Sequence, residues 1–126
     1  MITRLLLLHT GCLLIFFTSC QTDAASASGK QPDYDTLAKS YCDCASESIS
    51  LNDKMKGFLD SGDNKAFNGM VNEVQVAFDG SIRCASNAKS EHASGTVDKK
   101  KLGAALKNGC PQMPPRLTLE LLDKVK

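Results

Sequence analysis

Four cysteines carry the most readable chemistry of this chain: Cys42, Cys44, Cys84 and Cys110. An even number of cysteines in an oxidising compartment favours two disulfides, each worth about 2 to 4 kcal/mol of stability. The same four sulfurs could instead bind Zn or Cu(I) as thiolates. However, the Cys-x-x-Cys spacing that is common in zinc knuckles and in thioredoxin-like sites is absent. Disulfides are therefore the preferred interpretation, and a four-cysteine metal site stays as the alternative.

The other candidates for catalysis are sparse. After the N-terminal segment the chain has one histidine, His92, and no Gly-x-Ser-x-Gly motif accompanies it. The glycines form neither a phosphate-binding loop nor a dinucleotide fingerprint. The stretch Asp60–Asn64 fits a calcium loop poorly, because Lys65 stands where that loop requires glycine, and a turn with a helix cap explains it better. We therefore expect no enzyme, no cofactor and no bound metal.

The N-terminus has the features of an export signal. Arg4 precedes an apolar run, Leu5–Phe17, that is shorter than the roughly 20 apolar residues a membrane-spanning helix needs. The run ends in Phe17-Thr18-Ser19-Cys20, which resembles the lipobox of bacterial lipoproteins, although that family usually has an aliphatic residue at the position of Phe17. The resemblance implies that residues 1–19 are a signal peptide. It also implies that Cys20 becomes the first mature residue and carries the lipid.

An ordinary secretory signal or an uncleaved anchor is the alternative to lipidation. Several acyl chains on Cys20 would anchor the protein stably without spanning the bilayer. Because Gln21 stands where an Asp retains some lipoproteins at the inner membrane, the resemblance implies an exported protein anchored to the bacterial cell envelope at the outer membrane. Residues 20–31 are small and polar after the cysteine and are expected to be a flexible tether, followed by a helical domain over 32–126.

The charge of the mature chain excludes one large class of partner. Without Arg4, residues 20–126 contain 14 Lys and Arg against 14 Asp and Glu, so the net charge is zero. A nucleic-acid-binding domain needs a basic face. The one basic cluster, Lys99–Lys101, points in three directions around a helix and is expected to be a solvated face. We expect no binding to nucleic acid.

The first expected helix begins near Pro32. Apolar residues recur at alternating steps of four and three from Leu37 to Phe58, which predicts one continuous helix face. The sequence Asp60–Gly62 provides the stop signal. A wide apolar arc on this helix predicts contacts with two neighbours.

Three further helical segments follow. The second helix is expected to start at Asp63, and its interior glycines, Gly69 and Gly80, could let a neighbouring helix approach closely. Thr96 is expected to cap a third helix that ends near Asn108, and residues 116–126 form a short terminal helix. The expected fold class is all-α, a small disulfide-stapled helical bundle of three helices plus a short C-terminal helix.

Helix geometry also constrains the cysteine pairing. Residues two apart on a helix lie about 200° apart around its axis, so Cys42 and Cys44 must seek different partners. In an antiparallel hairpin that turns near Gly62, Cys84 lies opposite both of them. Cys44 is on the main apolar seam, which favours Cys44–Cys84 and Cys42–Cys110, and the swapped pairing stays open.

These observations predict a non-enzymatic, lipid-anchored envelope protein that binds a protein partner or serves as an accessory module. Such a function requires an exposed apolar groove, which we place where Met113, Leu117 and Leu121 pack. The alternative is an envelope protein that binds a small ligand, or a metal through the four cysteines.

Overall fold

The computed structural model describes residues 32–125, and every regular element in that range is a helix. The helices are α1 (Tyr34–Cys44), α2 (Ser46–Ser61), α3 (Asn64–His92), α4 (Lys99–Gly109) and α5 (Pro115–Lys124). The all-helical class is therefore confirmed. The predicted signal peptide, Cys20 and the tether lie outside the described residues. None of the helices within 32–125 combines the length and the apolar character needed to cross a bilayer.

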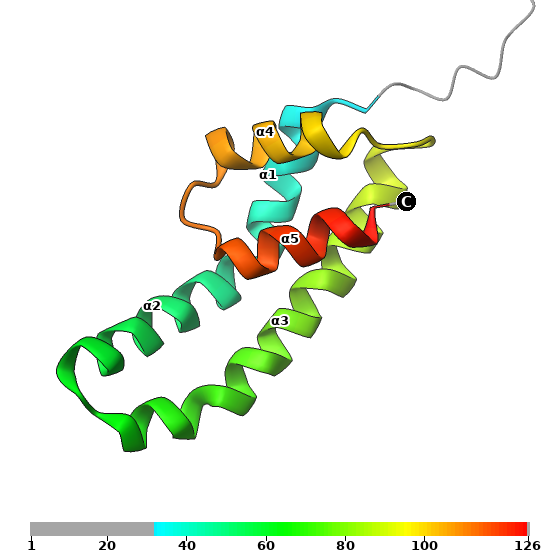
Figure 1. Ribbon diagram of the computed structural model, residues 1–126. Coiled ribbons are helices and arrows are strands. Elements are labelled where there is room, and N and C mark those ends of the chain that lie inside the picture. The colour runs from blue at the N-terminus through cyan, green and yellow to red at the C-terminus, as the bar shows by residue number, and fades with distance from the viewer. Residues whose placement is uncertain (1–31, 126) are drawn as a thin grey trace, which may run out of the picture.

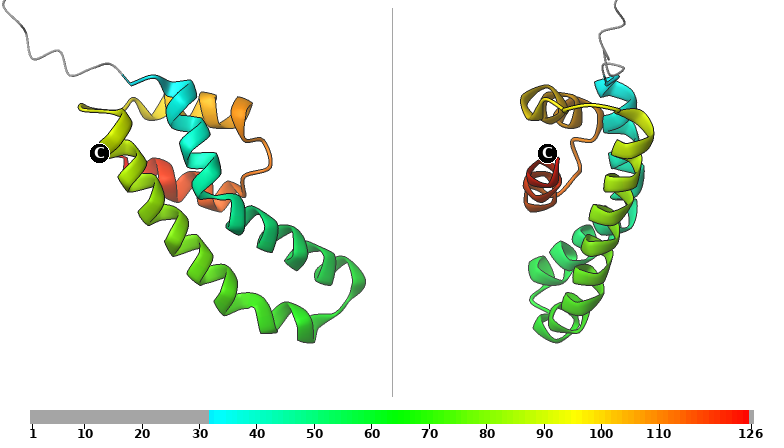
Figure 2. Two further views of the ribbon diagram at one scale, coloured as in Figure 1. Left: turned by 180° about the vertical axis from the view of Figure 1, so that it is seen from behind. Right: turned by 90° about the vertical axis from the view of Figure 1, so that its right-hand side faces the viewer.

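Two layers of helices enclose the core. Helices α1 and α3 lie side by side in one layer, and α4 and α5 form a second layer over them (Figures 1 and 2). The core is made by α1, the C-terminal half of α3, α4 and α5. Its largest fully buried apolar side chains are Tyr41, Leu37, Leu102, Leu106, Leu117 and Leu121.

The single helix expected over residues 32–59 is two helices in the structure, so the predicted count of three plus one is wrong. The break falls at Ala45, which is fully buried and has φ −88° and ψ −3°. Helix α1 packs against α4 and α3, whereas α2 leaves the core and runs antiparallel to the first half of α3 (Figure 1). The apolar periodicity of the sequence continues through Ala45, so it does not predict the break. The chain changes direction there because α1 and α2 pack against different helices.

Most of α2 and the first part of α3 form an arm that projects from the core. We define the arm as residues 52–76. No side chain of the arm is fully buried, because two helices alone can cover only the seam between them. Leu59, Val71 and Val76 of the arm are 55%, 47% and 69% exposed. The arm turns at Gly62, whose φ of +74° is a conformation that favours glycine, and Asp63 caps α3 by accepting a hydrogen bond from the Ala66 N–H.

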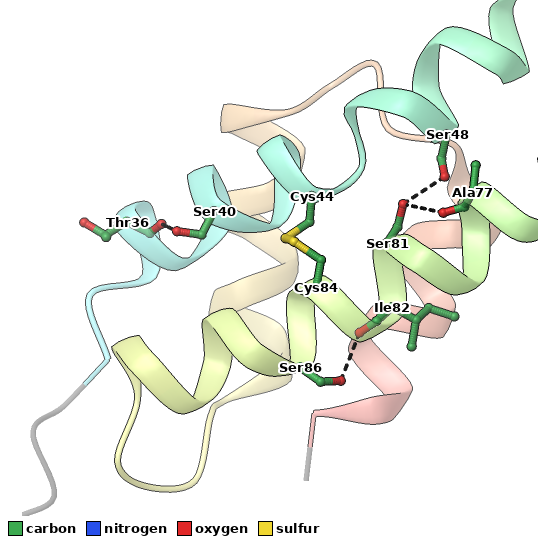
Figure 3. The surroundings of a disulfide bond; sticks show 9 residues. All are labelled: Thr36, Ser40, Cys44, Ser48, Ala77, Ser81, Ile82, Cys84 and Ser86. Atoms are coloured by element: carbon green, nitrogen blue, oxygen red, sulfur yellow. Dashed lines mark hydrogen bonds between the residues drawn. A yellow bond between two sulfur atoms is a disulfide. The ribbon is translucent and has the colours of Figure 1, made fainter.

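A buried pair of hydroxyls joins the base of the arm to the core. Ser48 Oγ of α2 lies 2.8 Å from Ser81 Oγ of α3, and Ser81 donates its own proton to the Ala77 carbonyl at 2.9 Å (Figure 3). The proton between the two serines therefore comes from Ser48. This bond gives α2 and α3 one polar contact at the level where the apolar core ends.

Replacing Ser81 by Ala is expected to lower the free energy of unfolding by about 1 to 3 kcal/mol, because it leaves the buried Ser48 hydroxyl without an acceptor. Replacing Ser48 is expected to cost less, since Ser81 keeps its bond to Ala77. Urea denaturation of Ser48→Ala, Ser81→Ala and the double variant measures this. If the two single losses simply add in the double variant, the hydroxyls are not coupled.

Gly69 and Gly80 do not mark a close helix contact, which corrects that expectation. A Cβ built on either residue would meet nothing within 4 Å. Gly69→Ala and Gly80→Ala are therefore each expected to stabilise the protein by about 1 kcal/mol, raising the melting temperature by about 4 to 8 °C. Gly62→Ala, at positive φ, is the matched control and is expected to lower the melting temperature. A lower melting temperature in Gly69→Ala or Gly80→Ala would contradict the open space around these glycines.

Helix α4 begins two residues later than predicted, because Asp98 and not Thr96 is its N-cap. The Asp98 carboxylate accepts hydrogen bonds from the backbone N–H groups of Lys100 at 2.8 Å and Lys101 at 3.2 Å. These bonds, chiefly that of Lys101, hold the pKa of Asp98 below its usual value. The Asp98 N–H donates to the hydroxyl of Tyr34 at 3.1 Å, which joins the start of α4 to the start of α1.

Candidate functional site

The first disulfide joins α1 to the end of α4. Cys42 is bonded to Cys110, with Cα atoms 5.7 Å apart and a sequence separation of 68. Cys110 is the C-cap of α4, is 2% exposed, and begins the turn that leads into α5. The bond thus holds the α4–α5 connection against α1.

The second disulfide joins α1 to α3, in the pairing that helix geometry favours. Cys44 and Cys84 have Cα atoms 5.5 Å apart, and Cys84 is exposed (Figure 3). In this form all four sulfurs are in disulfides, so none of them is a thiolate that could ligate a metal. Among residues 32–125 no three His, Cys, Asp or Glu side chains cluster in a way that could hold a metal ion.

The remaining candidates of the sequence are placed apart from one another. His92 is exposed at the end of α3, Asp60–Asn64 forms the turn at the tip of the arm, and Lys99–Lys101 is the exposed first turn of α4. Lys99 forms a surface ion pair with Asp123 at 3.7 Å. The structure brings none of these groups together into a common site.

An apolar groove lies between α4 and α5, on the outside of the second layer. It has a volume of about 560 Å³. Its lining comes from α4, the connecting turn and α5: Gly103, Leu106, Lys107, Cys110, Pro111, Met113, Pro115, Thr118, Leu119 and Leu122. Lys107 is the only charged residue among them, so the lining offers no acid–base pair and suits the binding of an apolar group.

The groove differs from the one predicted from sequence. Leu117 and Leu121 are 0% and 1% exposed and face the core, and neither of them lines the groove. Met113 does line the groove but is only 6% exposed and belongs to its floor. Leu119, on the opposite side of α5 from Leu117 and Leu121, lines the groove and is 70% exposed.

Local sequence explains why the groove stays open. Gly103 has no side chain, and a Cβ there would lie 3.4 Å from Leu122 Cδ1, so α4 presents backbone where another residue would fill the space. Pro114 and Pro115 set the start of α5: the Pro114 carbonyl accepts both the backbone N–H of Thr118, at 3.0 Å, and its hydroxyl, at 3.2 Å. Leu119 could have been found from sequence as the one leucine of this segment that lies off the apolar stripe of the helix.

Comparison with models of protein families, with curated proteins and with solved structures finds no match for this chain.

Proposed function

We propose that this protein is a lipid-anchored protein of the bacterial cell envelope, without enzymatic activity, that binds an apolar segment of another envelope protein in the α4–α5 groove. The observation that carries the proposal is the groove itself, with Leu119 70% exposed above an apolar floor. Leucine can be exposed singly without meaning, but here it borders a hollow of about 560 Å³ whose lining has one charge. A helix or loop that presents one or two apolar side chains fits such a surface.

The connection between the groove and the rest of the molecule supports a binding function. Cys110 and Met113 form part of the groove floor, and the bond from Cys110 to Cys42 holds that floor against α1. A preformed surface loses less conformational entropy when a partner binds. The disulfide therefore favours recognition by a rigid groove over recognition by a flexible one.

Two features of the chain support the anchor at the envelope. The first is the segment Phe17–Cys20 with its likeness to a lipobox. The second is the pair of disulfides, which persist in oxidising compartments outside the cytoplasm. We place the lipid on Cys20 and the anchor in the outer membrane, with residues 21–31 as the tether.

The anchor is tested by the intact mass of the protein isolated from the exporting bacterium, alkylated under denaturing conditions without reductant. We expect a chain that begins at Cys20, carries diacylglyceryl and acyl groups, and has no alkylated thiol. A chain that begins elsewhere or carries no lipid would overturn the anchor. Four alkylated cysteines would overturn the disulfides.

The groove is tested separately, by photo-crosslinking in the same cells. A photoreactive residue at Leu119 is expected to give one discrete adduct with an envelope protein, and the adduct should disappear when Lys107 is replaced by Glu and Leu122 by Asp. The same photoreactive residue at Val76, which is 69% exposed on α3 and does not line the groove, is the matched control. Equal adducts from both positions, or none from Leu119, would overturn the groove as the binding site while leaving the anchor untouched.

A further inference from the structure

The Cys44–Cys84 disulfide borders a hollow between α1 and α3, which we call the α1–α3 hollow. Its volume is about 450 Å³. No residue of α4 or α5 lines it, and it shares no residue with the α4–α5 groove, so the two surfaces are independent of each other. Its lining consists of Ser40, Asp43, Cys44, Cys84, Asn87, Ala88, Glu91 and His92.

This disulfide is the more accessible of the two. Cys84 is exposed and Cys44 is half-buried, and both line the hollow (Figure 3). In the other disulfide Cys110 is 2% exposed, and Cys42 Sγ accepts a hydrogen bond from the side-chain amide of Gln112 at 3.6 Å. Thiol–disulfide exchange requires a thiolate to reach a sulfur atom. The α1–α3 hollow therefore gives an incoming thiol its approach to Cys84 Sγ.

The lining of the hollow contains two carboxylates and no Lys or Arg. Asp43 precedes Cys44 at the end of α1, and Glu91 lies in the last turn of α3. Among residues 32–125 neither carboxylate forms an ion pair. A thiolate that enters the hollow and a thiolate that leaves from Cys44 are both repelled by these carboxylates. A positive charge on the incoming molecule offsets this repulsion.

We propose that the α1–α3 hollow is a thiol-exchange site at which Cys84 takes up a small thiol that carries an ammonium group. The thiolate of the incoming molecule attacks Cys84 Sγ, and the bond to Cys44 Sγ breaks. Its electron pair leaves with Cys44 as a thiolate, which takes a proton from water. The incoming sulfur is oxidised to a disulfide while Cys44 is reduced, so the step needs no other oxidant. Asp43 and Glu91 attract the ammonium group and favour a cationic thiol over a neutral or an anionic one.

Cys84, and not Cys44, is the cysteine that carries the added group. Cys44 is half-buried and precedes Ala45, which is fully buried where α1 meets α2. Cys84 is exposed on α3, so a group bonded to it lies in the hollow and displaces no core side chain. Attack by the Cys44 thiolate on the mixed disulfide releases the thiol and closes the original bond, so the modification is reversible.

The test measures how fast three small thiols open the Cys44–Cys84 bond of the full exported protein in a non-ionic detergent at low ionic strength. The probes are cysteamine, which is cationic, mercaptoethanol, which is neutral, and mercaptopropionate, which is anionic. Each rate is divided by the rate of the same thiol with a neutral model disulfide, so that differences in intrinsic reactivity cancel. We expect this relative rate to be about tenfold or more higher for cysteamine than for mercaptopropionate, with mercaptoethanol between them.

Peptide mass analysis after rapid alkylation locates the first adduct, which we expect on Cys84, with Cys44 alkylated. A first adduct on Cys44, or prior opening of the Cys42–Cys110 bond, would overturn the assignment of Cys84. Equal relative rates for the three thiols would overturn the selection of a cationic thiol.

Variants test whether the two carboxylates make the selection. Asp43→Asn with Glu91→Gln is expected to reduce the advantage of cysteamine over mercaptopropionate to about twofold or less. Asp53→Asn with Glu73→Gln changes the net charge equally on exposed residues that do not line the hollow, and this matched control should keep the wild-type selectivity. Unchanged selectivity in the first variant, or an equal loss in the control, would overturn the role of Asp43 and Glu91.

Discussion

Replacing Cys42 and Cys110 together by Ala is expected to lower the free energy of unfolding by about 4 kcal/mol. The bond links residues 68 positions apart, and closing a loop of that length in the unfolded chain removes conformational entropy equivalent to about 4.4 kcal/mol. Cys44→Ala with Cys84→Ala, across 40 positions, is expected to cost about 3.9 kcal/mol. Urea denaturation of the two double variants measures both. A loss below about 1 kcal/mol in either variant would contradict the role of that bond.

The two disulfides should also differ in their reactivity. Cys84 is exposed, whereas Cys110 is 2% exposed and Cys42 is half-buried. Because exchange requires a thiolate to reach a sulfur atom, a mild reductant is expected to open Cys44–Cys84 first. Alkylation followed by peptide mass analysis shows the order, and prior opening of Cys42–Cys110 would contradict it. Since small domains have a total stability of about 5 to 15 kcal/mol, opening both bonds is expected to unfold most of the chain.

Leu117 and Leu119 lie two positions apart on α5, and replacing each by Ala is expected to change the free energy of unfolding by very different amounts. Leu117→Ala removes a side chain that is 0% exposed and should lower the free energy of unfolding by about 2 to 5 kcal/mol. Leu119→Ala removes a side chain that is 70% exposed and should change it by no more than about 0.5 kcal/mol. Denaturant titration of both variants gives these values directly.

Leu119 is expected to contribute to binding although it contributes little to stability. Leu119→Ala should weaken the crosslinked complex of the α4–α5 groove, since burying a leucine side chain contributes about 1.5 to 3 kcal/mol. That corresponds to about tenfold or more in affinity. A stable Leu119→Ala variant that retains full binding would show that the groove is not the contact surface. An unstable one would show that Leu119 packs within the fold.

Helix ends could be predicted from sequence where they depend only on the residues next to them. The turn at Gly62 and the cap at Asp63 lie where the sequence predicts them, because a left-handed glycine and a capping carboxylate are needed whatever the helices pack against. The separation of Cys42 from Cys44 also followed from sequence, since residues two apart on a helix face different neighbours. In contrast, the break at Ala45 and the cap at Asp98 were not assigned from sequence, because apolar periodicity runs through the first and Thr96 is also a residue type that caps helices.

The binding surface shows the same limit more strongly. Sequence reasoning selected Met113, Leu117 and Leu121 as a groove, whereas the packing of α5 against the core buries Leu117 and Leu121 and leaves Leu119 outside.

The sequence by itself determined the helical class, the turn of the arm and the need for two different cysteine partners, because each depends on backbone geometry over a few residues. Only the tertiary structure decided which apolar face meets the core and which is left to solvent. That choice depends on how helices distant in sequence pack together. The α4–α5 groove, the surface proposed to bind a partner, arises from it.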